Sequence, residues 1–154
     1  MPKLVTKNTL PYSSKKIYDL VMDIEQYPKF LPWCRQAQII EVISAQNLHA
    51  DLLINFKNFF EKYRSSVTHG IDDNGNYFVD VIAIEGPFKK LVNKWQFIEI
   101  DHDKCQVEFF LEFEFNSKLL SKLIGPIFGK ASSKMMQAFE QRAKETIKVP
   151  GAKN

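Results

Sequence analysis

The sequence predicts an α+β fold, in which a curved antiparallel sheet packs around a long C-terminal helix and leaves an apolar cavity between them. Two features predict it. Between about residues 35 and 115 apolar side chains recur with a period of two, and from residue 118 to about 147 they recur at helical spacing. The connections between the expected strands are short and polar, which favours an antiparallel meander with one face for the helix to cover.

The composition predicts a single domain, residues 1–154 with a core at about 3–148. A chain of 154 residues that is 45% hydrophobic and 25% charged buries roughly 70% of the surface that its unfolded form exposes. No apolar run approaches the ~20 residues of a membrane-spanning helix, and the N-terminus lacks a signal-peptide apolar region. We therefore expect a soluble cytoplasmic protein with free thiols at Cys34 and Cys105. The net charge of +3 does not by itself predict nucleic acid, and DNA is not an expected partner.

The N-terminal part is expected to form one strand and two short helical segments. Residues 3–10 have the pattern of a short strand, and Ser13 or Ser14 can cap the amphipathic helix that follows. Pro28 and Pro32 then limit the next segment to a short helical turn and an irregular bend.

Strands are expected next at about residues 35–44, 48–57, 60–70, 76–84, 91–100 and 105–115. Polar residues on each strand mark its outer face, so the side chains that alternate with them face the helix. Only Phe110 breaks the alternation of the last strand. The candidate cavity-lining residues from the sheet and the helix are Val79, Val81, Trp95, Phe97, Phe109, Leu111, Phe113, Met135 and Phe139. The alternative is that these side chains form ordinary core.

The C-terminal segment is expected to be helical after a cap at Asn116 or Ser117, with Gly125-Pro126 kinking the helix or splitting it in two. Its apolar residues fall near a single stripe. This order of elements describes the helix-grip architecture.

Alternate turns of a meander lie at opposite ends of the sheet. One end then carries several aspartates, and the other gathers basic and aromatic residues, joined by Lys118 and Lys122 at the start of the last helix. A basic, aromatic rim at the mouth of an apolar interior is suited to an anionic membrane surface. The alternative is that the aromatics fold onto the core beneath solvated lysines. The candidate rim residues are Lys57, Phe59, Phe60, Phe88, Lys89 and Lys90.

No catalytic or metal-binding residue is predicted. The sequence has no glycine-rich phosphate loop and no nucleophile elbow. His49 and His69 lie on neighbouring expected strands and offer only a weak metal pair, against two surface or half-buried imidazoles. Arg64 is expected either to face solvent or to face a ligand.

Four separated segments together resemble one known family: Tyr27–Cys34, Glu85–Leu91 followed by Trp95 and Phe97, Phe113–Phe115, and Met136–Ala143. They are similar to the coenzyme Q-binding proteins of the START superfamily, which include the ribosome association toxins (RatA) and many members labelled polyketide cyclase/dehydrase. The resemblance covers about Tyr12 to Glu145. It implies a START/Bet v 1-like helix-grip fold whose hydrophobic tunnel holds a polyprenyl quinone.

The function expected from this reading is non-enzymatic binding of a ubiquinone-like lipid, with no required cofactor, by a protein peripheral to the inner membrane that supports quinone delivery and respiratory electron transport. The alternative is a RatA-like toxin whose lysines meet rRNA of the large ribosomal subunit and block subunit association. A cyclase or aromatase is the least favoured class, because the inward face lacks an evident acid/base pair.

Overall fold

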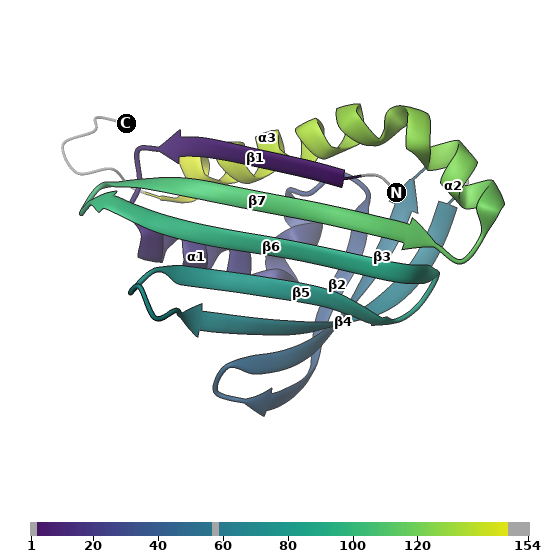
Figure 1. The fold of residues 1–154 in the computed structure, drawn as a ribbon, viewed down its shortest axis with the longest axis horizontal. Coiled ribbons are helices and arrows are strands. Elements are labelled where there is room, and N and C mark those ends of the chain that lie inside the picture. The colour runs from purple at the N-terminus through teal and green to yellow at the C-terminus, as the bar shows by residue number, and fades with distance from the viewer. Residues whose placement is uncertain (1–2, 57–58, 148–154) are drawn as a thin grey trace.

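The chain folds around a seven-stranded antiparallel sheet with the strand order β1-β7-β6-β5-β4-β3-β2. The structure, a computed structural model, describes residues 3–56 and 59–147. The sheet curves, so that β2 and β3 pass behind the other strands in Figure 1. The strands are β1 (Lys3–Leu10), β2 (Cys34–Ser44), β3 (Asn47–Phe56), β4 (Phe59–Ile71), β5 (Tyr77–Glu85), β6 (Phe88–Asp101) and β7 (Lys104–Phe115).

Five helical segments within the described part of the chain complete the fold. The Ser13 hydroxyl caps the first of them, accepting a hydrogen bond from the Lys16 amide. Gly125 and Pro126 split the C-terminal segment in two, as expected. No helix in the described ranges is both long and apolar enough to cross a bilayer. The segments are α1 (Ser14–Met22), the 3₁₀ turns η1 (Ile24–Lys29) and η2 (Gly125–Ile127), and the helices α2 (Lys118–Ile124) and α3 (Phe128–Thr146).

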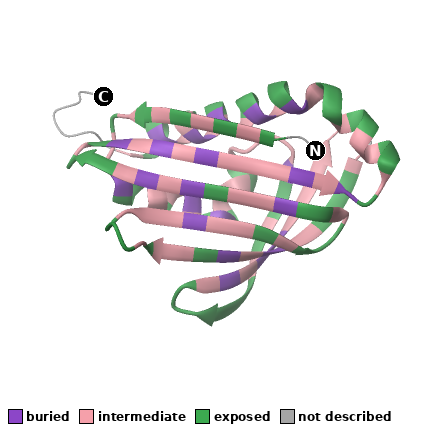
Figure 2. Ribbon diagram, in the orientation of Figure 1, coloured by how far each residue is buried: buried purple, intermediate pink, exposed green. Residues whose placement is uncertain are grey.

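The core lies between the concave face of the sheet and the helices α1 and α3. Buried residues alternate along β6 and β7, as Figure 2 shows. Trp95 and Phe97 face inward, and Lys94 and Gln96, which alternate with them, face the other side of the sheet. This confirms the expected direction of these side chains. The sheet residues pack against Ile17 and Val21 of α1 and against Met136, Phe139 and Ala143 of α3.

The stripe of α3 that packs on the core differs from the expected one. Phe128, Ser132, Met136, Phe139 and Ala143 are buried. Met135, which is expected to line the cavity, is only partly buried and lies beside this stripe. The 3₁₀ turn at Gly125-Pro126 separates α2 from α3, so one continuous helical stripe cannot describe both.

The strand boundaries near the expected rim also differ. The connection between β5 and β6 is only Gly86-Pro87, because Phe88 already pairs with Phe115 of β7. Phe59 likewise begins β4, paired with Phe56. The aromatic residues expected in turns therefore belong to strands, and their pairing decides which face each side chain takes.

Candidate functional site

A cavity of about 230 Å³ lies between the sheet and the C-terminal helical segments. Strands β3 to β7 supply one wall, and α2, η2 and the first turns of α3 supply the other. Figure 1 shows α2 beyond the end of β7, where this part of the sheet is covered. The lining is almost entirely apolar: Trp33, Ile54, Phe56, Phe59, Tyr63, Val81, Phe88, Leu91, Asn93, Leu111, Phe113, Phe115, Ile124, Ile127, Phe128, Ala131, Ser132 and Met135.

A second, smaller cavity of about 70 Å³ lies deeper, towards α1. Its walls include Val21 and Ile24. Tyr63, Val81 and Asn93 line both cavities. These three side chains therefore separate the larger space from the smaller one.

The structure divides the nine candidate lining residues between cavity and packed core. Val81, Leu111, Phe113 and Met135 line the larger cavity, and Val79, Val81 and Trp95 line the smaller one. The other three line neither: Phe97, Phe109 and Phe139.

Direct packing of helices on the sheet fills the half that contains those three residues. The Tyr18 ring of α1 meets Phe97 edge-on at 6.2 Å, and the Phe139 ring of α3 meets Trp95 at 5.0 Å. The larger cavity lies at the other half, towards α2. In the half that contains Phe97, Phe109 and Phe139 the candidate lining residues form ordinary core, which was the alternative to a cavity.

The candidate rim aromatics take different directions. Phe59 and Phe88 line the cavity, whereas Phe60 is 60% exposed. Phe88 stacks on Phe115 with ring centroids 5.0 Å apart and meets Tyr63 edge-on at 5.2 Å. Two of the three aromatics are thus walls of the cavity, and Lys57 lies outside the described residues.

Lys89 and Lys90 are exposed, but both lie near carboxylates of the neighbouring strand. Lys90 Nζ is 2.7 Å from a carboxylate oxygen of Glu112, and Lys89 Nζ is 3.8 Å from Glu114. The hydrogen bond from Lys90 lowers the pKa of Glu112. These pairs partly neutralise the positive charge that the sequence predicted for the rim.

Helix α2 carries exposed leucines that were not predicted from the sequence. Leu119 is 66% exposed and Leu123 is 58% exposed, while Leu120 and Ile124 on the other side pack against the cavity cluster. Lys118 and Lys122 are exposed on the same helix. We call the end of the cavity bounded by Phe59, Phe115 and α2 the mouth.

Trp33, another lining residue, has a backbone conformation that is rare outside glycine. Its φ is +67°, in the left-handed region that costs free energy for a bulky residue. The Trp33 carbonyl accepts a hydrogen bond from the Asn55 amide at 2.8 Å, and the ring meets Phe56 edge-on at 4.8 Å. These contacts hold the indole against the cavity.

Arg64 lines neither cavity. Its guanidinium donates two hydrogen bonds to Asp51, from Nε at 2.7 Å and from Nη2 at 3.1 Å. Lys62 lies 3.5 Å from the same carboxylate. The hydrogen bond from Arg64 lowers the pKa of Asp51, so the pair is a structural ion pair away from the candidate ligand site.

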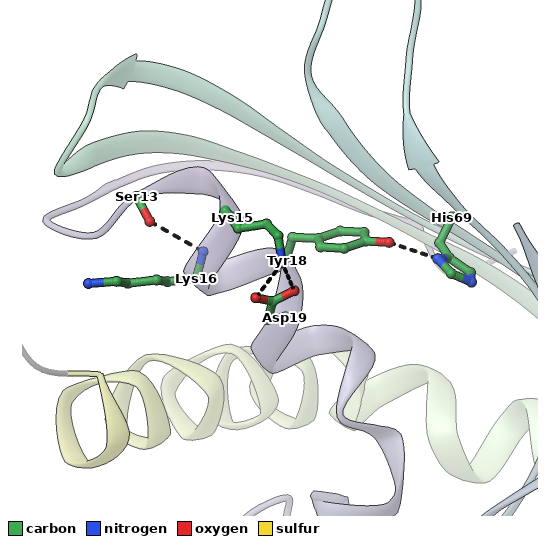
Figure 3. Close-up of polar contacts among 6 residues, drawn as sticks. All are labelled: Ser13, Lys15, Lys16, Tyr18, Asp19 and His69. Atoms are coloured by element: carbon green, nitrogen blue, oxygen red, sulfur yellow. Dashed lines mark hydrogen bonds and ion pairs between the residues drawn. The ribbon is translucent and has the colours of Figure 1, made fainter. Parts of the chain in front are cut away.

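The best-defined histidine contact lies far from the mouth. Figure 3 shows the Tyr18 hydroxyl of α1 pointing to Nδ1 of His69 on β4, at 2.7 Å. Burial lowers the pKa of His69, which favours neutral imidazole as the acceptor. The bond joins α1 to the sheet beside the Tyr77 ring, which lies 4.7 Å from Tyr18.

The hypothesis that His49 and His69 together bind a metal ion is wrong. His69 points inward to Tyr18, whereas His49 alternates with the buried residues Leu48 and Ala50 and so faces outward. Among the described residues, no group of three or more His, Cys, Asp or Glu side chains is arranged to hold a metal ion.

The thiol nearest the site is unsuited to nucleophilic chemistry. Burial raises the pKa of the Cys34 thiol to about 11, and Cys34 Sγ donates to the Gln36 carbonyl at 3.6 Å. A thiol of this pKa carries almost no thiolate at neutral pH.

A hollow of about 470 Å³ lies on the other face of the sheet. Charged residues such as Asp80, Lys94 and Glu108 line it together with Phe78 and Phe110. Charged side chains are thus part of its wall, whereas the described residues that line the space beneath α2 include no charged side chain. The cavity beneath α2 is therefore the candidate functional site.

Comparisons with known proteins agree with this fold. Residues 10–140 match the family described as polyketide cyclase / dehydrase and lipid transport. A protein named ribosome association toxin RatA from Rickettsia prowazekii is 48% identical over 139 residues, covering 90% of this chain and 94% of the relative. The coenzyme Q-binding protein COQ10 homolog B from Xenopus laevis is 28% identical over 138 residues, covering 87% of this chain and 54% of that protein.

A solved structure extends the comparison. The Zhui aromatase/cyclase from Streptomyces sp. R1128 superposes with a TM-score of 0.81, covering 99% of both chains, at 11% identity. That likeness concerns the fold alone. The family match over residues 10–140, the RatA relative and the helix-grip fold together show that this chain belongs to the polyketide cyclase/dehydrase and lipid transport family.

Proposed function

We propose that this chain binds a polyprenyl quinone in the cavity beneath α2 and does not act as an enzyme. The observation that carries the proposal is the nearly complete apolar lining of the cavity at the α2 end of the sheet. Such a site suits an isoprenoid chain with a small polar head. The family description includes lipid transport, and one relative is named a coenzyme Q-binding protein.

The polar groups in the cavity support binding and not catalysis. Tyr63, Asn93 and Ser132 line it, and none of the three side chains is a carboxylate, imidazole or lysine. Burial raises the pKa of Tyr63, which leaves its phenol protonated at neutral pH. General acid/base chemistry needs a group that titrates near the working pH.

The volume of the cavity indicates how much of the lipid it encloses. About 230 Å³ is below the roughly 300–1,000 Å³ of sites that enclose drug-sized ligands. A quinone ring and the first part of its chain fit this space better than a long polyprenyl tail does. The rest of the tail would leave through the mouth, where a bilayer can cover it.

The surface around the mouth is suited to an anionic membrane. Leu119, Leu123 and Phe60 are exposed there, and Lys118 and Lys122 lie beside the leucines. Each lysine near an anionic bilayer contributes about 1 kcal/mol, and each leucine that enters the acyl region adds roughly 1.5–3 kcal/mol. Several such contacts give reversible docking.

Fluorescence titration tests the cavity. A ubiquinone with two isoprene units should quench the emission of Trp33, which lines the cavity. Ala131→Phe fills the same space and should abolish saturable quenching. Ser133→Phe, exposed on the same helix, is the matched control and should bind as the parent does. Equal binding by the two variants would contradict the proposed site.

Vesicle binding tests the mouth. Replacing Leu119 and Leu123 by aspartate should weaken sedimentation with vesicles that contain phosphatidylserine. Replacing the exposed Ile40 and Val42 of the edge strand β2 by aspartate controls for a general loss of surface hydrophobicity. Unchanged sedimentation of the α2 variant would show that the mouth does not dock.

A second candidate function is association with the large ribosomal subunit. It is favoured by the 48% identical relative named RatA and by two pairs of exposed lysines, one pair on α2 and one on α3. We call these four residues the lysine ridge: Lys118, Lys122, Lys130 and Lys134. No ridge lysine forms an ion pair within residues 3–56 and 59–147, and no carboxylate occurs between Asn116 and Phe139.

The spacing of the ridge suits a phosphate backbone. Four residues of helix rise about 6 Å, so the two lysines of each pair can meet successive phosphates of one RNA strand. Binding of this kind weakens steeply as salt is added. Lys130→Glu with Lys134→Glu should then abolish co-sedimentation with large ribosomal subunits, while the α2 leucine variant retains it. The reverse pattern would favour the membrane over the ribosome.

A further inference from the structure

The inner end of the apolar cavity carries a group of polar side chains that the proposed quinone function does not by itself require. Tyr63 and Asn93 lie where the larger and smaller cavities meet. Ser132 of α3, which is 4% exposed, lines the larger cavity from the helix side. Polar groups placed in an apolar site fix the orientation of what binds there.

Asn93 is held rigidly. Its Oδ1 accepts a hydrogen bond from Trp95 Nε1 at 3.0 Å, and its Nδ2 donates to the Phe110 carbonyl at 3.0 Å. An amide has two N–H donors, so the second one is still available to a ligand. These two bonds fix the orientation of the side-chain amide, with Nδ2 as the donor and Oδ1 as the acceptor.

The Tyr63 hydroxyl has no hydrogen-bond partner among the described residues. Within the ranges that the structure describes, Tyr63 makes a ring contact with Phe88 but its hydroxyl forms no hydrogen bond. Burial raises the pKa of this phenol, so the hydroxyl remains a donor at neutral pH. A hydroxyl that lines an apolar cavity and has no protein partner can donate a hydrogen bond to a ligand carbonyl, which adds to the affinity of that ligand.

The polarity of the wall changes along the cavity. Towards the mouth the wall consists of apolar side chains from three strands and the C-terminal helices: Phe59, Phe88, Phe113, Phe115, Ile124 and Phe128. A ligand inserted chain first would place its carbonyl groups among these phenylalanines and leave Tyr63 unpaired. A ligand inserted ring first would place its carbonyl beside Tyr63 and Asn93 and its chain along the apolar wall.

We propose that Tyr63, with Asn93, forms a carbonyl-binding subsite at the inner end of the cavity, so that a prenylated quinone enters ring first and its chain leaves at the mouth. The inference rests on the proposed quinone function and adds the orientation of the bound ligand in the cavity. Tyr63 is the specificity-determining donor, because its hydroxyl lies where the two cavities meet and has no hydrogen-bond partner among the described residues. The subsite favours a conjugated carbonyl over a hydrocarbon of the same shape.

Tyr63→Phe tests the subsite, because it removes the hydroxyl and keeps the ring. The probes are a ubiquinone with two isoprene units and a benzene ring that carries the same side chain. Tyr63→Phe should weaken quinone binding about 3- to 10-fold, the effect of losing one hydrogen bond. Its affinity for the prenylated benzene should not fall. Tyr12→Phe, outside both cavities, is the matched control.

The ligand-free protein separates this role from a merely structural one. Since the hydroxyl has no partner without ligand, Tyr63→Phe should leave the melting temperature of the free protein unchanged or raise it. The infrared carbonyl band of the bound quinone should move to higher frequency in the same variant, as expected for a carbonyl that loses a hydrogen bond. An unshifted band would overturn the inference.

The outcomes show separately whether the proposed subsite fails and whether the proposed quinone function fails. If the parent protein binds quinone and Tyr63→Phe binds it equally well, the subsite is wrong while quinone binding stands. If the parent binds neither probe, the proposed function itself fails and the subsite fails with it. If both probes lose affinity equally in Tyr63→Phe, the residue acts through cavity shape and not through its hydroxyl.

Discussion

Gly86 passes so close to Tyr63 that a Cβ atom at position 86 would lie 2.6 Å from the Cβ atom of Tyr63. The φ of Gly86 is +133°, a conformation that L side chains rarely adopt. The two-residue turn between β5 and β6 therefore packs directly on a residue that lines the cavity. Through this contact the Gly-Pro turn helps to set the position of the cavity wall.

The close approach predicts the effect of adding one methyl group. Gly86→Ala combines a clash with backbone strain, and strained backbone conformations alone cost about 1–3 kcal/mol. We expect urea denaturation to show at least that loss of stability. Gly129→Ala in α3, where no atom lies within 4 Å of the added carbon, should instead stabilise the protein by about 0.5–1 kcal/mol. Equal effects at the two positions would contradict the packing described.

The division between packed core and cavity predicts unequal costs of truncation. Phe97 is completely buried, so Phe97→Ala should cost about 3–5 kcal/mol of unfolding free energy. Phe88 already borders the cavity, so Phe88→Ala should cost less and should enlarge the ligand space. Thermal and urea unfolding of both variants check this order, and a larger cost at Phe88 would show that the cavity is filled.

The ion pair of Asp51 predicts a stability effect that depends on pH. Arg64 lowers the pKa of Asp51 in the folded state, so its contribution is present above the unfolded pKa of about 3.9 and is lost as the pH falls through the lowered value. Asp51→Asn should therefore melt below the parent at pH 7, and the difference should vanish under acid conditions. A difference that stays constant with pH would exclude a charge effect.

The His69 contact predicts a second pH effect at milder acidity. Because burial lowers the folded-state pKa of His69, the unfolded chain takes up the proton first as the pH falls below about 6.5. Stability should be full above that pH and should decrease towards the lowered folded-state pKa. His69→Gln should flatten the profile. Parallel profiles for the parent and His69→Gln would contradict this.

The sequence predicted the fold well because its patterns are local. The alternation around Trp95 and Phe97 identified the inner face, and Gly125-Pro126 marked the division of the C-terminal segment. These signals depend only on the period of each element and on the backbone properties of glycine and proline.

The location of the cavity could not be predicted from the same patterns. Phe97 and Phe113 share one face of the sheet, yet helices fill the space over Phe97 and leave room over Phe113. The distance between helix and sheet decides this difference, and periodicity does not contain it. Tyr63 and Asn93 were missed because a single polar residue on an inward face gives no repeating signal.

The directions of the rim residues also depended on pairing. Phe88 looked like a turn residue after Gly86-Pro87, but its pairing with Phe115 makes it the first residue of β6 and turns its ring inward. The exposed Leu119 and Leu123 fell outside the expected rim. Only the packing of α2 shows which of its leucines remain uncovered.

Native mass spectrometry with organic extraction, on protein purified from a quinone-producing bacterium, tests the central claim most directly. The account predicts one polyprenyl quinone per chain in the parent protein and none in Ala131→Phe, whose added ring fills the cavity. A lipid-free parent protein that co-sediments with large ribosomal subunits would contradict it, and so would a quinone that stays bound when the cavity is filled.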